Sequence, residues 1–205
     1  MKPKSIILLS GGLDSTVSAA VAKRRTRPLF ALTVDYGQRA AKMEIAASRR
    51  ICQSLKIRHK VVKLPFFEEF SKLILLRGKK KNIKRFKKIE DVWVPNRNGL
   101  FINIAACFAE YYDAKIIVTG FNQEEAQEFP DNSERFLQAV NRCLGYSTLN
   151  RVVVRSYVLR NTKKEVYKLG VRYKAPLDQV YSCYLGGKNM CGKCASCKKL
   201  IKASK

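Results

Sequence analysis

The sequence predicts an α/β domain built on a parallel, doubly wound sheet, followed by a small C-terminal metal-binding appendage. Short apolar runs alternate with helix-like segments, which is typical of a parallel sheet covered by helices. A turn with two glycines follows the first apolar run, and four cysteines gather in the last quarter. With 205 residues, 46% of them hydrophobic, the chain can bury one good core. We expect residues 1–180 to form the domain and residues 181–205 the appendage.

The expected strands are short and apolar, and turn residues or charges bound them, as Pro28 and Asp35 bound the second. In chain order they are residues 5–9, 28–34, 59–64, 115–119 and 151–155. The segments between them place apolar residues at helical spacing, such as Ile51 and Leu55. The expected helices are residues 15–25, 39–55, 101–112 and 163–169.

The chain is strongly basic, with a formal net charge of +25. Such a charge favours polyanions, so nucleic acid is a candidate partner. The densest run, residues 77–88, contains eight basic residues and no acid, and we interpret it as a mobile loop near the active site. Most of the excess positive charge lies outside this run. We therefore interpret the basic residues mainly as part of a solvated surface, which also attracts anionic substrates.

Segment lengths and cysteine use point to a cytoplasmic protein without a membrane partner. No apolar run approaches the roughly 18 residues of a membrane span. The apolar start is too short for a secretory core and runs into glycines. Among the seven cysteines, Cys52, Cys107 and Cys143 stand alone in apolar or helical settings, which is typical of reduced thiols.

Residues 10–16, Ser-Gly-Gly-Leu-Asp-Ser-Thr, have the composition of a phosphate-binding loop. They lie between a buried strand and a helix, so backbone N–H groups and the positive helix end converge there. Gly11 and Gly12 permit a tight turn and a close approach of phosphate. The hydroxyls of Ser10, Ser15 and Thr16 can add donors, and Asp14 can hold a magnesium ion against the phosphates. The longer loop that ends in Gly-Lys-Ser/Thr is absent from the sequence.

The clustered cysteines form a second candidate site. They are Cys183, Cys191, Cys194 and Cys197. This spacing can place four thiolates around one tetrahedral ion, and four sulfur ligands leave no open position for catalysis. We therefore predict a structural zinc ion, with an iron–sulfur cluster or a redox thiol pair as alternatives. The only histidine, His59, lies far away in the sequence.

The phosphate loop resembles the pyrophosphatase loop of the N-type ATP pyrophosphatases, or PP-loop enzymes. The resemblance implies an adenine nucleotide alpha hydrolase-like fold and an enzyme that adenylates its substrate, releasing AMP and pyrophosphate. Asp14 and Ser15 are implied in catalysis, and residues 33–35 would edge the adenine and ribose. The residues implied to hold ATP are Leu9, Ser10, Gly11, Gly12, Leu13, Asp14, Ser15, Thr16, Val17, Ser18 and Ala19.

Further motifs extend the resemblance over nearly the whole chain. They are residues 35–39 (DYGQR), 94–98 (VPNRN), 120–122 (GFN), 129–131 (FPD) and the segment from Ser182 to Cys197. Together they resemble the 7-cyano-7-deazaguanine synthase family of the queuosine and archaeosine precursor pathway. The resemblance implies a homodimeric ATP-dependent ligase that converts 7-carboxy-7-deazaguanine and ammonia to the nitrile. Adenylated carboxylate and amide are the implied intermediates. Free ammonia is implied because the chain has no glutamine-hydrolysing domain.

The same resemblance nominates residues around the substrate. Arg97 would reach into the pocket from a rigid turn after Pro95, although a capped helix start is the alternative. Lys163 would neutralise phosphate charge, although a lysine that opens a helix is usually solvated. Asp131 is the expected partner of the exocyclic amine of the base. The residues expected to orient substrate or nucleotide are Gln38, Arg39, Arg97, Asn98, Asn122 and Asp131.

Three positions depart from the commoner family pattern. Ala40 replaces a histidine, Glu44 comes one residue late, and Asn132 replaces a cysteine. They fall among the expected substrate contacts and leave the phosphate loop and the cysteines untouched.

Two other interpretations of the chain remain. A PP-loop enzyme that thiolates or aminates a base within tRNA would explain the surface charge through phosphate contacts. A non-catalytic zinc module that binds nucleic acid through the lysine-rich tail would leave the phosphate loop unexplained.

Overall fold

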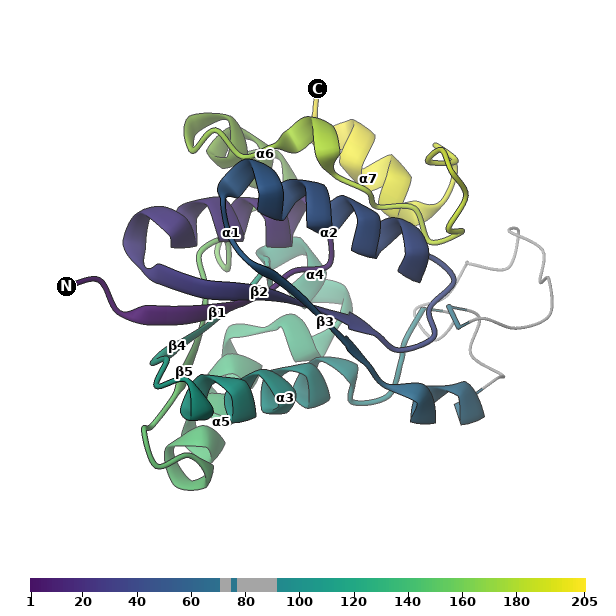
Figure 1. Ribbon diagram of the computed structural model, residues 1–205. Coiled ribbons are helices and arrows are strands. Elements are labelled where there is room, and N and C mark those ends of the chain that lie inside the picture. The colour runs from purple at the N-terminus through teal and green to yellow at the C-terminus, as the bar shows by residue number, and fades with distance from the viewer. Residues whose placement is uncertain (71–74, 77–91) are drawn as a thin grey trace.

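The computed structural model describes residues 1–70, 75–76 and 92–205. Its centre is a five-stranded parallel sheet in the order β3-β2-β1-β4-β5 (Figure 1). The strands are β1 (Lys4–Leu8), β2 (Arg27–Asp35), β3 (His59–Lys63), β4 (Ile116–Thr119) and β5 (Val153–Ser156). Each begins and ends within two residues of an expected strand, so the prediction of a parallel α/β domain is confirmed.

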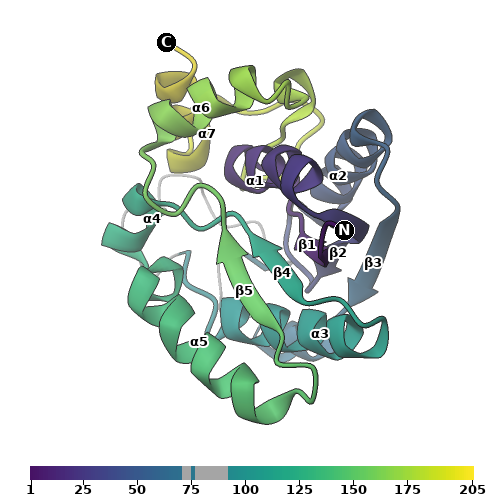
Figure 2. The same ribbon diagram turned by 90° about the vertical axis from the view of Figure 1, so that its left-hand side faces the viewer.

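Helices cover both faces of the sheet (Figures 1 and 2). One face carries α1 (Leu13–Arg25), α2 (Ala41–Leu55), α6 (Lys163–Arg172) and α7 (Ala195–Ala203). The other carries α3 (Arg97–Tyr111) and α5 (Glu134–Ser147), while the short α4 (Gln123–Glu128) follows β4. Because side chains alternate along a strand, Ile7 of β1 packs into the core under α1 and α2, and Ile6 packs into the opposite core with α3. Within the described residues, none of the helices is both long and apolar enough to cross a membrane.

Three helices were not expected from the sequence, and α1 and α3 begin two and four residues earlier than expected. Helix α5 carries Leu137, Val140 and Leu144 at helical spacing, a pattern that was not assigned to a helix from the sequence. In α4 no residue is fully buried, and α7 begins inside the cysteine cluster. Helix α3 begins at Arg97 rather than at residue 101, because Asn96 adopts the left-handed conformation (φ 51°) that turns the chain into the helix. The basic run 77–88 lies outside the described residues.

The strand order places a topological switch beside β1. The chain adds β2 and β3 on one side of β1 and then returns to add β4 on the other side. At such a switch the turns after neighbouring strands diverge, and parallel α/β sheets bind ligands in the resulting crevice. Here the two turns pack closely, since a Cβ at Gly120 after β4 would lie only 2.5 Å from the backbone nitrogen of Ser15. The fold therefore sets the phosphate loop at the carboxyl edge of the sheet.

Candidate active site

A pocket of about 290 Å³ opens at this edge of the sheet. The ends of β1, β2 and β4 contribute Leu9, Thr33 and Thr119 to its lining. Residues from α1, α2, α3, α4, α6 and α7 also line it. Segments from the whole length of the chain therefore meet at one cavity.

The turn after β1 leaves the beginning of α1 open to an anion. Gly12 is the residue before the helix, and it has no side chain that could cap the N–H groups of the first turn. The hydroxyls of Ser10 and Ser15 lie 3.1 Å apart, and that of Ser15 donates to the Gly12 carbonyl oxygen at 3.2 Å. Gly11 has a φ of +79°, and a Cβ there would lie 2.9 Å from the carbonyl oxygen of Glu44. The loop thus offers backbone N–H groups and two hydroxyls at one point.

Residues 9–19, the expected nucleotide-binding segment, divide into two groups. Those that line the pocket are Leu9, Ser10, Gly12, Leu13, Asp14 and Ser15. Gly11 lies outside this lining and is packed between the turn and α2. Residues 16–19 are buried in α1, where Thr16 Oγ1 donates to the Gly12 carbonyl oxygen at 2.7 Å. Residues 16–19 therefore hold α1 in place behind the loop.

A chain of ion pairs runs from the phosphate loop to α7. Lys163, the first residue of α6, contacts Asp14 Oδ2 and lies 3.1 Å from Glu125 Oε1. Lys199 of α7 lies 3.3 Å from the same oxygen and 2.8 Å from Glu128 Oε2. The Lys163 side chain is only 13% exposed. It is therefore a buried member of the pocket and not a solvated lysine at a helix start.

Burial and ion pairing oppose each other in this network. Burial raises the pKa of the Asp14 carboxyl, and Lys163 limits the shift. Burial acts in the same direction on Glu125, but Lys163 and Lys199 together hold its pKa below the ordinary value. Burial alone would lower the pKa of Lys163, yet Asp14 and Glu125 raise it above the usual range. Lys163 is therefore positively charged beside the phosphate loop.

Arg97 and Asn98 open α3 and line the pocket at the same time. Arg97 Nη1 donates to the Tyr36 hydroxyl at 3.3 Å, and its guanidinium carbon lies 5.8 Å from the centre of the Tyr36 ring. Asn98 Nδ2 donates to the carbonyl oxygen of Asp131 at 3.4 Å. The expected rigid turn is a helix start instead, and the helix start itself brings Arg97 to the pocket.

Gln38 lines the pocket but uses its amide within the protein. Its Oε1 accepts from the Tyr36 N–H at 2.9 Å. Its Nε2 donates to a carbonyl oxygen of β2 at 3.2 Å and to Glu44 Oε2 at 2.8 Å. Arg39 lies outside the lining, and its Nε donates to the Leu76 carbonyl oxygen at 3.2 Å. Both side chains therefore hold the loop after β2.

Asn122 and Asp131 also lie outside the lining residues. Asn122 caps α4, because its Oδ1 accepts from the N–H of Glu125 at 3.0 Å, and it thereby positions that acid. Asp131 lies in a short 3-10 turn after α4, where its Oδ1 accepts from Asn132 Nδ2 at 3.0 Å. Burial raises the pKa of the Asp131 carboxyl, and Arg97 opposes the shift.

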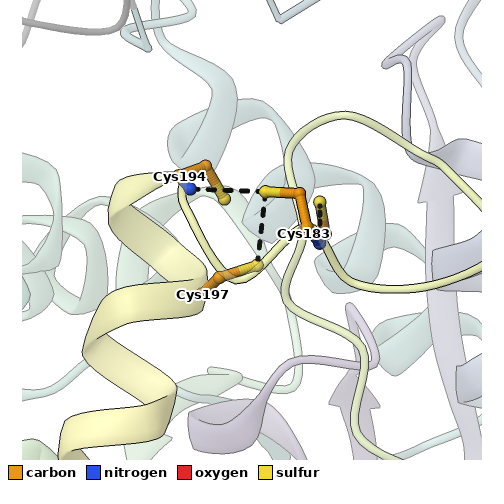
Figure 3. A group of neighbouring side chains, drawn as sticks. Cys183, Cys194 and Cys197 are labelled. Atoms are coloured by element: carbon orange, nitrogen blue, oxygen red, sulfur yellow. Dashed lines mark hydrogen bonds between the residues drawn. The ribbon is translucent and has the colours of Figure 1, made fainter.

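Four cysteine sulfur atoms gather at one point, those of Cys183, Cys191, Cys194 and Cys197. All four lie within 4.8 Å of one another. Figure 3 shows Cys183 on its loop beside Cys194 and Cys197 at the start of α7. The backbone N–H groups of Lys193 and Cys194 donate to Cys191 Sγ at 3.4 and 3.3 Å. Although burial opposes ionisation, such donors lower the pKa of Cys191 to about 7. The cluster can hold a metal ion.

The cysteine segment also builds part of the pocket. The N–H of Tyr181 donates to the carbonyl oxygen of Gly11 at 2.9 Å. Gly186 (φ +71°) packs so closely on the loop after β2 that a Cβ would lie 2.2 Å from the carbonyl oxygen of Arg39. The lining residues from this part of the chain are Tyr181, Ser182, Tyr184, Ser196, Lys199 and Leu200. A metal held by the cysteines would thus fix one wall of the pocket.

Glu125 and Lys199 line the pocket but were not predicted from the sequence. Glu44 also lines it, although the sequence analysis noted this residue only as a departure from the family pattern. Glu125 follows the carboxyl end of β4, and this position beside a switch point was a usable signal. Lys199 is one of several lysines around the cysteines, so nothing in the sequence singles it out.

Comparison with known proteins gives relatives of the full length. Residues 4–204 match the family described as Queuosine biosynthesis protein QueC. The 7-cyano-7-deazaguanine synthase of Carboxydothermus hydrogenoformans is 48% identical, over 98% of this chain and 97% of the relative. The 7-cyano-7-deazaguanine synthase of Methanococcus aeolicus is 41% identical, over 98% of this chain and 94% of the relative.

Solved structures share the fold at low identity. The U34-tRNA thiolase NcsA of Methanococcus maripaludis, solved with its [4Fe-4S] cluster, has a TM-score of 0.55 at 16% identity, covering 99% of this chain and 64% of the thiolase. The NH3-dependent NAD synthetase of Campylobacter jejuni has a TM-score of 0.53 at 18% identity, covering 87% and 67%. The PP-loop type of fold expected from the sequence is thereby confirmed.

Proposed function

This chain belongs to the QueC family of queuosine biosynthesis proteins, and on that premise we propose that it converts 7-carboxy-7-deazaguanine and ammonia to 7-cyano-7-deazaguanine. ATP would supply the energy and leave as AMP and pyrophosphate. The observation that carries the proposal is the uncapped start of α1 with the buried, charged Lys163 beside it. Together they form a site for a leaving pyrophosphate at the carboxyl edge of the sheet.

The proposed reaction has two activations. A carboxylate oxygen of the acid attacks the α-phosphorus of ATP, and pyrophosphate leaves. Ammonia then attacks the acyl carbon, AMP departs and a proton is lost, which gives the amide. The amide oxygen is adenylated in the same way, and the second AMP leaves as the nitrogen loses its two protons.

Side chains of the pocket take distinct parts in this scheme. Ser10, Ser15 and the first N–H groups of α1 hold the departing pyrophosphate, and Lys163 stabilises the charge that develops on it. Arg97 and Asn98 orient the acid, while Asn122 positions Glu125 and through it Lys163.

A magnesium ion fits the phosphate site. Among the described residues, Asp14 Oδ1 and Thr119 Oγ1 are buried without a hydrogen-bond partner, although both residues line the pocket. Magnesium takes oxygen ligands and usually binds through one or two carboxylates together with substrate phosphates. We propose that Asp14 holds it, where it would neutralise phosphate charge.

A structural zinc ion fits the cysteine cluster. Zn–S bonds of about 2.3 Å in a tetrahedron set the sulfur atoms roughly 3.8 Å apart. The Sγ atoms of Cys191 and Cys197 are 3.9 Å apart. A cubane cluster would spread its thiolates more widely around four irons. We propose that residues 181–205 are a zinc-binding appendage that completes the pocket of a catalytic domain formed by residues 1–180.

The test is product analysis with purified protein, 7-carboxy-7-deazaguanine, ammonium and ATP. We expect the nitrile by mass spectrometry, with AMP and pyrophosphate as the nucleotide products. We expect the Asp14→Ala variant to lose this turnover. ADP and orthophosphate, or full turnover by the variant, would contradict the proposal. Metal analysis should find one zinc per chain, and bound iron would favour a cluster instead.

Base modification within tRNA is the second candidate, and the net charge of +25 favours it. Filter binding with tRNA tests the second function, because micromolar or tighter, salt-sensitive binding would favour the RNA enzyme. We propose that the protein works in the cytoplasm as a homodimer on free small molecules.

A further inference from the structure

Among the described residues, three acidic side chains line the pocket, and one of the three has no ion pair with a cation. Asp14 and Glu125 pair with Lys163. Glu44 of α2 has no ion pair among the described residues, and its hydrogen-bond donor is the neutral amide of Gln38. Two charged groups act on the pKa of Glu44: Arg97 favours the ionised form, and Asp35 opposes it.

An unpaired carboxylate is costly in this position. Burial raises the pKa of Glu44, which means that the protein supplies too few donors to its ionised form. The pocket must also admit ATP and a carboxylic acid, and a bare carboxylate would repel both. Glu44 therefore calls for a ligand group with N–H donors.

A guanine-like base carries such donors side by side, on its ring N1–H and on its exocyclic amine. Two adjacent N–H groups match the two oxygens of a carboxylate, as in other bidentate pairs. We propose that Glu44 accepts both donors and is the residue that selects a 2-amino base. This inference rests on the proposed function, since it names the group that reads the substrate of that reaction.

The surroundings of Glu44 support this role. Gln38 is a positioning residue, because its amide is held by Tyr36 and by β2 and then donates to Glu44 Oε2 at 2.8 Å. Both amide protons are thereby used within the protein. Tyr36 and Phe101 also line the pocket, with ring centres 5.4 Å apart, and present aromatic surface to a planar base.

Asp131, which the sequence suggested for the exocyclic amine, is less suited to it. Asp131 does not line the pocket, and its carboxylate accepts from the neighbouring Asn132 at 3.0 Å. Glu44 likewise accepts from a side-chain amide, that of Gln38, but unlike Asp131 it lines the pocket.

The experiment compares two substrates in five proteins. The substrates are 7-carboxy-7-deazaguanine and its analogue without the 2-amino group. The proteins are wild type, Glu44→Gln, Glu44→Asp and Asp131→Asn, with exposed Glu69→Gln as a control for loss of a charge. Pyrophosphate release gives KM and kcat for each acid, calorimetry gives the Kd for ATP, and circular dichroism confirms folding.

We expect wild type to favour the 2-amino substrate by roughly 10- to 100-fold in kcat/KM, the range of one bidentate base contact. Glu44→Gln should raise KM for that substrate by a similar factor, leave the Kd for ATP unchanged and largely abolish the preference. Glu44→Asp keeps the charge but moves it back by one methylene, so it should also raise KM for the 2-amino substrate and weaken the preference. Glu69→Gln should behave like wild type.

Three results would overturn the inference while the proposed function stands. They are an unchanged preference in folded Glu44→Gln, a weaker Kd for ATP with unchanged KM for the acid, and loss of the preference in Asp131→Asn alone. If wild type itself releases no pyrophosphate with the acid, the proposed function fails together with the inference.

Discussion

Replacing Lys163 by methionine tests whether the ion pairs at the phosphate loop hold the site together. The change keeps most of the side-chain volume but removes the cation shared by Asp14 and Glu125. Removing one partner of a buried ion pair costs about 3–5 kcal/mol in the free energy of unfolding. The side chains of Asp14 and Glu125 are 18% and 21% exposed, so water can partly replace the ammonium group. We therefore expect the lower end, about 3 kcal/mol.

The loss should also depend on pH in a defined direction. In the wild type the pKa of Glu125 lies below its ordinary value. Ionised Glu125 therefore stabilises the folded protein at pH values above the ordinary pKa, and this stabilisation is lost as the pH falls through the lowered pKa. Without Lys163 the pKa of Asp14, already raised by burial, rises further. Both carboxyls then accept protons more readily, which relieves their repulsion. The stability deficit of Lys163→Met should therefore be largest near pH 8 and shrink towards pH 5.

Urea unfolding at these two pH values measures the effect. The matched control is Lys164→Met, one position along α6, where the lysine is exposed. We expect that control to change stability by less than about 0.5 kcal/mol. Equal losses in the two variants, or a deficit of Lys163→Met that grows as the pH falls, would refute the buried network.

Three further outcomes follow from the geometry of the pocket. Gly120→Ala should lower ATP turnover at least about 10-fold, because the added Cβ would lie 2.5 Å from the Ser15 nitrogen. The control is Gly145→Ala in α5, where the added Cβ meets nothing within 4 Å. Thermal melts should show that this control is neutral or stabilises the helix. Ser15→Ala should lower kcat for pyrophosphate release about 10²-fold through loss of one donor, and an unchanged kcat would exclude the hydroxyl from that role. Removing the proposed zinc ion with a chelator should lower the melting temperature and raise KM for ATP, because the cysteine segment and Lys199 form part of the pocket wall. Added zinc should restore both values. Unchanged ATP kinetics after chelation would show that the cysteine cluster does not support the site.

Local patterns in the sequence were enough to predict the sheet and the two chemical motifs. A buried parallel strand is a short apolar run whatever surrounds it, so all five strands lie where the runs predicted. The phosphate loop could be recognised for the same reason, since its glycines, hydroxyls and acid are consecutive. The cysteines are close in sequence, and the structure brings their four sulfur atoms within 4.8 Å.

Only the tertiary structure decided which other side chains share the pocket. Lys163 and Asp14 are 149 residues apart in sequence, and they meet because α6 packs on α1. The sequence offered Gln38 and Asp131 as substrate contacts, but both side chains make hydrogen bonds within the folded protein. Glu44 lines the pocket and has no ion pair within the part of the chain that the structure describes. A residue's type and neighbours in sequence determine which chemistry it can perform. Its partners depend on where the turns after separate strands converge, and that is a property of the assembled sheet.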